Sequence, residues 1–360
     1  GEFIASSLHD KVEILQNAPE NTEQKFYEMA LSFVYENKSY IEDMPDYYIL
    51  LISSISKLGA NGSDGIDKLL LQIYKDFDDY SVRLAVLDAF SRIKIQTDEI
   101  YDFVMEIVTS ELEKEENVSV DILVSCLNAL ANINNPACCD LLFSILKEDL
   151  TQEIIDADKN ALYALMDGFY QTASYIVRSG STEDKLLVLD LITSNPKNDK
   201  KSCAEIAEIL LSESIIKDEE QEDFKFSQDI VKLQYDSFIC LKDAKWTKST
   251  KLVLEYFEIA KEEYEDKLLD TDKFCEIIVS LKDFSTRDTC KVLTNFLASQ
   301  YNQTVEKGTF DVDVLLSVIN TLGELGDNEA FDTILYVISW KDYPKEINVA
   351  SNDALKKLRW

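Results

Sequence analysis

The chain has 360 residues, enough for two or three ordinary domains or one extended array, and its 46% hydrophobic content can bury a core. Its 36 Lys and Arg residues against 68 Asp and Glu residues give a net charge of −32, which argues against nucleic-acid binding and membrane-surface roles. With only 9 Gly, 5 Pro and no apolar run as long as a membrane span, the composition predicts a helical chain without membrane insertion.

The first segment, residues 1–45, is expected to cap the helices that follow it. Its opening letters, GEF, lack an initiator Met and look like a cloning scar, so a leader could have been removed. The seven cysteines are odd in number and form no CxxC, which favours free buried thiols in a reducing compartment. We therefore expect a cytoplasmic protein, the alternative being an exported or periplasmic one whose leader is gone.

Residues 46–170 contain a recurring helical stripe with small residues at its centre. The clearest copy is Val82, Ala85, Ala89 and Ile93, whose steps of three, four and four residues place them on one helix face. A weaker copy begins 32 residues earlier at Leu50, and the next two are Ile122, Ser125, Ala129, Ile133 and Ile154, Ala157, Ala161, Leu165. Alanines at these positions predict helices that are stacked at close approach.

A second type of helix is expected before some of the stripes. Its apolar positions are Ile66, Leu69, Leu70, Ile73, then Cys139, Leu142, Phe143, Leu146, and then Phe331, Ile334, Leu335, Ile338. Each set follows a start signal, at Ser63 or Asp64, at Asn135 with Pro136, and at Asp327 with Asn328. Since neighbours on one helix point in different directions, only Cys139 of the pair Cys138 and Cys139 is expected to face the core.

Two stretches, residues 58–93 and 322–358, resemble HEAT repeats, in particular the short repeats of phycobilisome-lyase-like HEAT proteins. The resemblance rests on Asp79 at the turn, on Val82-Arg83 and the stripe, and on Gly59 and Gly62, which Gly323 and Gly326 match. It covers residues 46–170 and 311–360. It implies an all-α fold, an α-α superhelix in the form of a right-handed solenoid, which serves as a scaffold. With only five Arg, a continuous Asp–Arg ladder cannot form, and contacts between repeats are expected to be mostly apolar.

Residues 171–310 remain helical in pattern but drift from this template. Apolar faces recur in residues 185–194, 203–212, 229–241, 251–269 and 290–301, with separators at Asn195-Pro196, Lys217–Asp223, Trp246–Ser249 and Asp283–Arg287. We expect longer, divergent repeats of the same superhelix, with a separate helical domain as the alternative. In residues 311–360 the stripe returns twice, 33 residues apart, at Val314, Ser317, Thr321, Leu325 and at Ile347, Ala350, Ala354, Leu358.

The sequence offers little for catalysis. His9 is the only histidine and is expected to face solvent, which excludes histidine triads and His-rich metal sites. The glycines of residues 59–65 fit a helix stop and turn, because no strand precedes them and no GK[ST] follows. The acidic clusters at residues 76–81, 217–224 and 270–274 lack the ligand spacing of a calcium loop. We expect no catalytic residue, metal or cofactor, and nothing fixes the tetrapyrrole site of a chromophore lyase.

One position of the stripe always carries an amide or a carboxylate. Six residues after the first stripe residue lie Asp88, Asn128, Asn160, Asn320 and Asp353, at the border between the packed and exposed faces of the helix. Two interpretations stay open. The side chains could bond turns or helix ends of neighbouring repeats, or they could hold the backbone of an extended peptide, as the asparagine ladder of armadillo proteins does.

The sequence therefore predicts a non-enzymatic scaffold that binds a protein or peptide, with a basic segment as a suitable target, on the inner face of the solenoid. One alternative is a lyase-like or regulatory subunit that holds a small ligand in the groove. Another is a structural spacer within a larger assembly.

Overall fold

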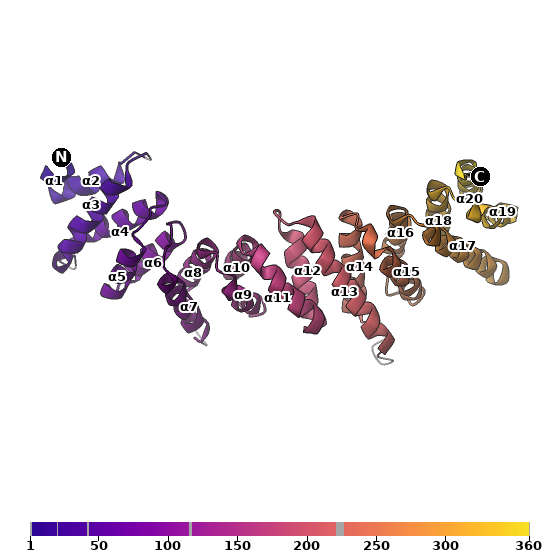
Figure 1. Ribbon diagram of the computed structural model, residues 1–360, viewed down its shortest axis with the longest axis horizontal. Helices are drawn as coiled ribbons and strands as arrows, with labels where there is room; N and C mark the ends of the chain where they lie inside the picture. Colours follow the sequence, from indigo (N-terminus) through magenta and orange to yellow (C-terminus); the bar gives the residue numbers. More distant parts are fainter. Residues whose placement is uncertain (1, 20, 42, 115–116, 221–226, 360) are drawn as a thin grey trace. The chain divides into compact units, whose positions relative to one another are not determined.

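The computed structural model describes residues 2–19, 21–41, 43–114, 117–220 and 227–359. These residues form twenty α-helices joined by turns and short 3₁₀ segments, and no strand (Figure 1). The prediction of an all-α chain is confirmed. The helices group into two compact units, residues 1–172 (unit 1) and residues 173–360 (unit 2).

Unit 1 begins with a helix of four residues and continues with helices of seven to sixteen residues. Its helices are α1 (Glu2–Ala5), α2 (Leu8–Gln16), α3 (Gln24–Glu36), α4 (Pro45–Ala60), α5 (Asp67–Asp76), α6 (Tyr80–Phe90), α7 (Asp98–Leu112), α8 (Val120–Ile133), α9 (Cys139–Ile145) and α10 (Gln152–Ala164). Helix α11 (Met166–Ser179) crosses the boundary between the units.

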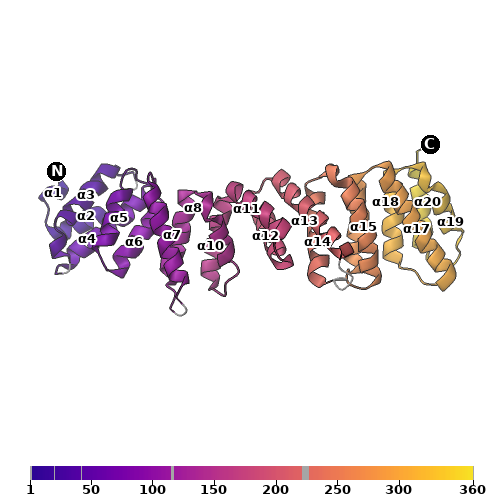
Figure 2. The same cartoon turned by 60° about the horizontal axis from the view of Figure 1, so that its bottom comes forward.

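Unit 2 contains longer helices on average. They are α12 (Thr182–Ser194), α13 (Lys200–Glu220), α14 (Gln228–Asp243), α15 (Thr250–Glu265), α16 (Thr271–Ser280), α17 (Arg287–Lys307), α18 (Val312–Leu325), α19 (Phe331–Ser339) and α20 (Lys345–Lys357). Figure 2 shows both units from a second side.

The helices that carry the small-residue stripe pack against one another in succession. In unit 1, α4 packs on α6, α6 on α8 and α8 on α10, while α3, α5, α7 and α9 each pack on the stripe helix that follows them in sequence. In unit 2, α16 packs on α18 and α18 on α20 in the same way, with α17 and α19 beside them. The clearest copy of the stripe is buried as predicted, with Val82, Ala85, Ala89 and Ile93 all below 9% exposure. In the other copies Ile133, Ser317, Leu325 and Ala350 are only half-buried.

Glycine occurs where two stripe helices come closest. A Cβ atom added to Gly59 of α4 would lie 3.0 Å from Cα of Ala89 in α6, and one added to Gly323 of α18 would lie 2.9 Å from Cα of Ala354 in α20. Three residues later Gly62 and Gly326 have φ angles of +63° and +71°, which end each helix. The two copies share this geometry, which confirms that small residues set the approach and that residues 59–65 form a helix stop and turn.

Tyrosine hydroxyls connect successive helix pairs within each unit. In five cases the hydroxyl donates a hydrogen bond of 2.6–2.9 Å to a carboxylate that lies 31–47 residues later: Tyr35 to Asp76, Tyr48 to Asp79, Tyr80 to Asp121, Tyr235 to Glu276 and Tyr264 to Asp311. We call these the phenol–carboxylate links. They add polar contacts, which the sequence did not predict, to the apolar packing between helices.

Three details differ from the sequence prediction. Cys138 is fully buried like Cys139, because it belongs to the 3₁₀ turn Pro136–Cys138, whose tighter winding turns both thiols inward before α9 begins. Helix α16 lies in a stretch where no element was expected. The expected separator Lys217–Asp223 is helical up to Glu220, the last residue of α13, and residues 221–223 lie outside the described residues.

Candidate functional site

All five residues of the predicted Asn/Asp ladder are exposed, and each lies on a different helix. Asp88, Asn128 and Asn160 belong to α6, α8 and α10 of unit 1, and Asn320 and Asp353 belong to α18 and α20 of unit 2. The structure thus brings three of them onto one series of directly packed helices in unit 1 and the other two onto a second such pair in unit 2.

The three positions in unit 1 are part of a larger polar surface. Residues seven or four positions before a ladder residue share its side of the helix, since seven residues make almost two full turns. The exposed members that carry an amide or a carboxylate are Asp88 on α6, Asp121 and Asn128 on α8, and Glu153, Asp156 and Asn160 on α10. We call these six residues the ladder surface. It combines amide groups, which both donate and accept hydrogen bonds, with four carboxylates.

The ladder surface is rich in carboxylates, and the helices that carry it contribute few cations. Helices α6, α8 and α10 contain only two basic residues, Arg83 and Lys159, and neither lies on the same side of its helix as the ladder residue. Arg83 is held by Asp78, with Nη1 2.7 Å from Oδ1, and its Nε donates to the Phe77 carbonyl oxygen. The field at this surface therefore attracts positive groups.

Internal hydrogen bonds fix two of its carboxylates. The Ser125 hydroxyl of α8 donates to Asp88 of α6 at 2.7 Å, and the Tyr80 hydroxyl of α6 donates to Asp121 of α8 at 2.9 Å. The first bond joins the two helices within their length, and the second joins their first turns. None of the five ladder residues bonds the end of a neighbouring helix through its side chain within the part of the chain that the structure describes.

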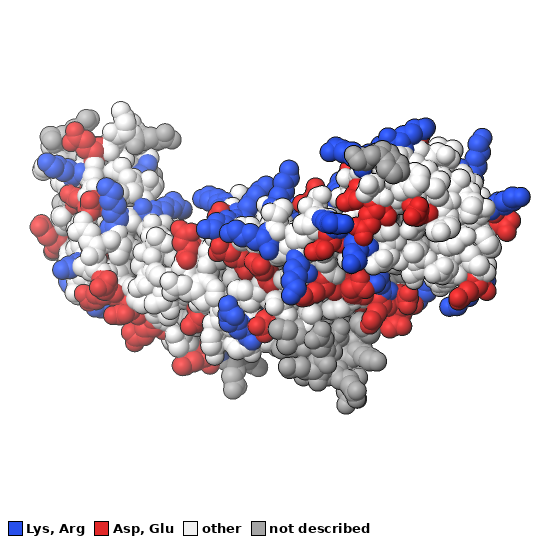
Figure 3. All heavy atoms as spheres, turned by 45° about the vertical axis from the view of Figure 1, so that its right-hand side comes forward, with Lys and Arg blue, Asp and Glu red and all other residues white. Residues whose placement is uncertain are grey.

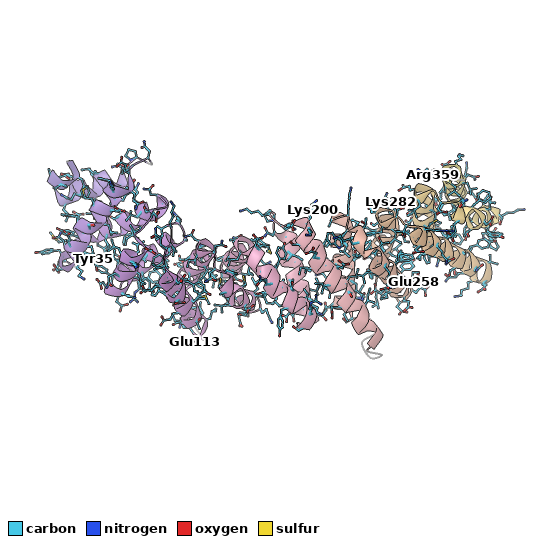
Figure 4. The ribbon with its side chains drawn as sticks, viewed as in Figure 1. Tyr35, Glu113, Lys200, Glu258, Lys282 and Arg359 are labelled. Carbon is cyan, nitrogen blue, oxygen red and sulfur yellow. The ribbon has the colours of Figure 1, made fainter. Side chains whose placement is uncertain are left out.

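The ladder positions of unit 2 have a mixed electrostatic environment. Asp353 accepts a hydrogen bond from Lys356 at 2.7 Å, and this bond holds the pKa of Asp353 below its usual value. Glu324, one turn after Asn320, accepts a hydrogen bond from Lys282 at 2.9 Å. Lys200, Lys282 and Arg359 lie along one edge of unit 2 (Figure 4). Figure 3 shows Lys and Arg side chains interspersed with Asp and Glu side chains on the face that it draws.

A second candidate site, which sequence reasoning missed, is a groove between α15 and α17 in unit 2. It encloses about 890 Å³ and is open to solvent. Lys261, Tyr264 and Glu265 of α15 line one wall, and a polar face of α17 with Asn295, Ser299, Asn302, Gln303 and Glu306 lines the other. The one signal in the sequence is the seven-residue spacing of Asn295 and Asn302.

The floor and the end of this groove are tightly packed. Phe296 is buried there, with its ring edge-on to Phe257 and Phe274 at centroid distances of 5.5 and 5.8 Å. The Tyr264 hydroxyl donates to Asp311 Oδ2 at 2.7 Å, while Oδ1 of Asp311 accepts from the backbone amides that begin α18. Burial and this bond raise the pKa of Tyr264 to about 12.

The described residues contain no group of three or more potential metal ligands. His9 is exposed, as expected, within 4 Å of Glu13 and Asp46. Burial raises the pKa of the Cys138 thiol to about 12 and that of Cys290 to about 11, so these groups are protonated and weakly nucleophilic at neutral pH.

The chain matches no protein-family model and no curated protein sequence. Among the described residues, no helix combines the length and apolar character that crossing a membrane requires.

Proposed function

We propose that the chain is a non-enzymatic scaffold that binds an extended basic segment of a partner protein on the ladder surface. In this proposal the helix pairs continue as a right-handed, HEAT-like superhelix. The repeated glycine-to-alanine approach in both units supports this arrangement, because it places equivalent helices at equivalent distances.

The observation that carries the proposal is the row formed by Asp88, Asn128 and Asn160. Each is exposed, and each occupies the same position on one of three successively packed helices. Packed helices lie roughly 8–10 Å apart, which is about three residues of an extended chain. Amides at this spacing bond the backbone of a peptide at regular intervals, and the four carboxylates pair with its Lys and Arg side chains.

The test uses a fluorescent dodecapeptide in which Lys and Arg alternate with Ser and Gly. Its binding to the full chain is measured by anisotropy, and Asn128→Ala combined with Asn160→Ala is expected to weaken binding about tenfold, as for two lost hydrogen bonds. Raising the salt concentration should weaken binding further, because exposed charges are screened.

The matched control is Asn21→Ala, an equally exposed asparagine in the turn before α3, which should bind the peptide like the parent chain. Thermal unfolding of the double variant should stay within about 0.5 kcal/mol of the parent, as for exposed substitutions elsewhere. A loss of several kcal/mol would show that the asparagines hold the helices together. Equal binding by parent and double variant would contradict the proposal.

A further inference from the structure

We propose that the groove between α15 and α17 is a second, independent binding site, which takes an extended polypeptide segment without net charge. It shares no residue with the ladder surface, and all of its lining residues lie in unit 2. This ligand follows from the hydrogen-bonding groups of the wall, from their spacing and from the balance of charge around the groove.

The α17 wall presents groups that suit a peptide backbone. Asn295, Ser299, Asn302 and Gln303 lie within one face of the helix, and amide or hydroxyl side chains donate and accept hydrogen bonds at the same place. A peptide backbone offers one donor and one acceptor in each residue, so it matches such a wall better than an apolar ligand or a phosphate does.

The spacing of these groups agrees with an extended chain. The seven residues from Asn295 to Asn302 span roughly 10 Å of helix, about the length of three extended residues. The whole wall, from Asn295 to Glu306, covers about 16 Å and thus about five residues of peptide. A volume of about 890 Å³ lies at the upper end of the range for pockets that hold small molecules, so the groove has room for a short peptide segment.

The charges around the groove balance. Lys261, Lys267 and Lys307 stand against Glu265, Glu306 and Asp311. Two of these six groups are already satisfied within the protein, because Lys261 pairs with Glu258, and Asp311 binds Tyr264 and the start of α18. The groove would repel a strongly charged ligand as much as attract it. The peptide segment that binds there is therefore expected to carry neutral side chains.

Contacts within the protein hold the groove in shape without a ligand. The buried Tyr343 hydroxyl donates to Thr304 of α17 at 2.9 Å, and the Phe310 ring packs edge-on against Tyr343 at 5.0 Å. These contacts fix the end of α17 and the segment that leads to α18. A site that needs little ordering retains more of its contact energy on binding.

The test selects linear random octapeptides, displayed on phage, against the immobilised full chain. Enriched peptides should have low net charge. Their affinity should fall about tenfold with Asn302→Leu, which removes one amide that donates and accepts, and should be lost with Ser299→Arg, which fills the groove. Asn21→Leu is the matched control and should bind like the parent. A change from about 0.1 to 0.5 M salt should alter affinity less than about twofold.

Two outcomes would overturn this site. One is an absence of enriched clones. The other is enrichment only of clones that bind the Asn302→Leu and Ser299→Arg variants like the parent chain. Clones that are basic, are released by salt and depend on Asp121 would occupy the ladder surface. Such clones would support the proposed function while contradicting the groove, so the two proposals can fail separately.

Discussion

Gly323 of α18 faces Ala354 of α20 with no room for one more methyl group. A Cβ atom at residue 323 would lie 2.9 Å from both Cα and Cβ of Ala354. Gly323→Ala is therefore expected to reduce the free energy of unfolding by about 1–3 kcal/mol through overpacking, although alanine favours helix. Urea unfolding measures the change. Asn320→Ala, at an exposed position of the same helix, should be neutral or slightly stabilising, and equal stability of parent and Gly323→Ala would show that the helices can part without strain.

Asp158 of α10 is a residue that the fold keeps neutral. It is fully buried, neither carboxylate oxygen has a hydrogen-bond partner among the described residues, and burial raises its pKa to about 8. An unfolded Asp has a pKa of about 3.9, so between these values the native state holds a proton that the unfolded state lacks. This group therefore makes stability fall as pH rises from about 4 to 8.

Asp158→Asn removes that dependence and keeps the shape of the side chain. The variant should be more stable than the parent at pH 8, and the difference should shrink as the pH approaches 4. Urea unfolding midpoints at several pH values measure it. A variant that is less stable than the parent at pH 8 would show that the carboxylate is ionised and paired.

At the scale of single elements, the phenol–carboxylate links join helices that are not neighbours in sequence. Tyr264 of α15 bonds Asp311, whose second oxygen caps α18. Tyr264→Phe should lower the free energy of unfolding by about 1–2 kcal/mol, as for a lost hydrogen bond to a charged group. Tyr301→Phe is the control, since the ring of Tyr301 packs against Tyr336 and Trp340 and its hydroxyl makes no hydrogen bond among the described residues. Equal effects of the two variants would contradict the role of the link.

The elements also show what the sequence could and could not reveal. The stripe helices were predictable because they depend on local spacing. The start signal at Asp327 is confirmed, since its side chain accepts the backbone amide of Glu329 at 3.0 Å. Helix α16 was missed although its buried Phe274, Ile277 and Ile278 have the spacing of a helix face. The groove was missed because its walls, Lys261–Glu265 and Asn295–Glu306, are distant in sequence and meet only through packing. No local pattern indicates which exposed amides will border a hollow.

For the molecule as a whole, the raised tyrosine pKa values predict a loss of stability in alkaline solution. Burial, followed by the bond to a carboxylate, raises the pKa of Tyr35, Tyr235 and Tyr264, the last to about 12. Unfolded tyrosines ionise near pH 10, so from about pH 10 to 12 the native state binds protons that the unfolded state has lost. Stability should be fully present below pH 10 and decrease through that range.

Urea unfolding midpoints between about pH 9 and 11.5 test this expectation. The midpoint should begin to fall near pH 10, and Tyr264→Phe should show a shallower decline because one titrating link is gone. A midpoint that is constant up to pH 11 would contradict it.

The use of tyrosine as donor has a consequence for how this acidic chain can vary. At Asp79, Asp121 and Asp311 a neutral hydroxyl ties one helix pair to the next. At Asp76 and Glu276 the hydroxyl shares the carboxylate with Lys38 and Lys242. At the first three links, the contact between helix pairs and the surface charge therefore depend on different amino acids. Substitutions can then change the surface charge, and adapt it to a new salinity or a new binding target, while these hydrogen bonds between helix pairs stay in place.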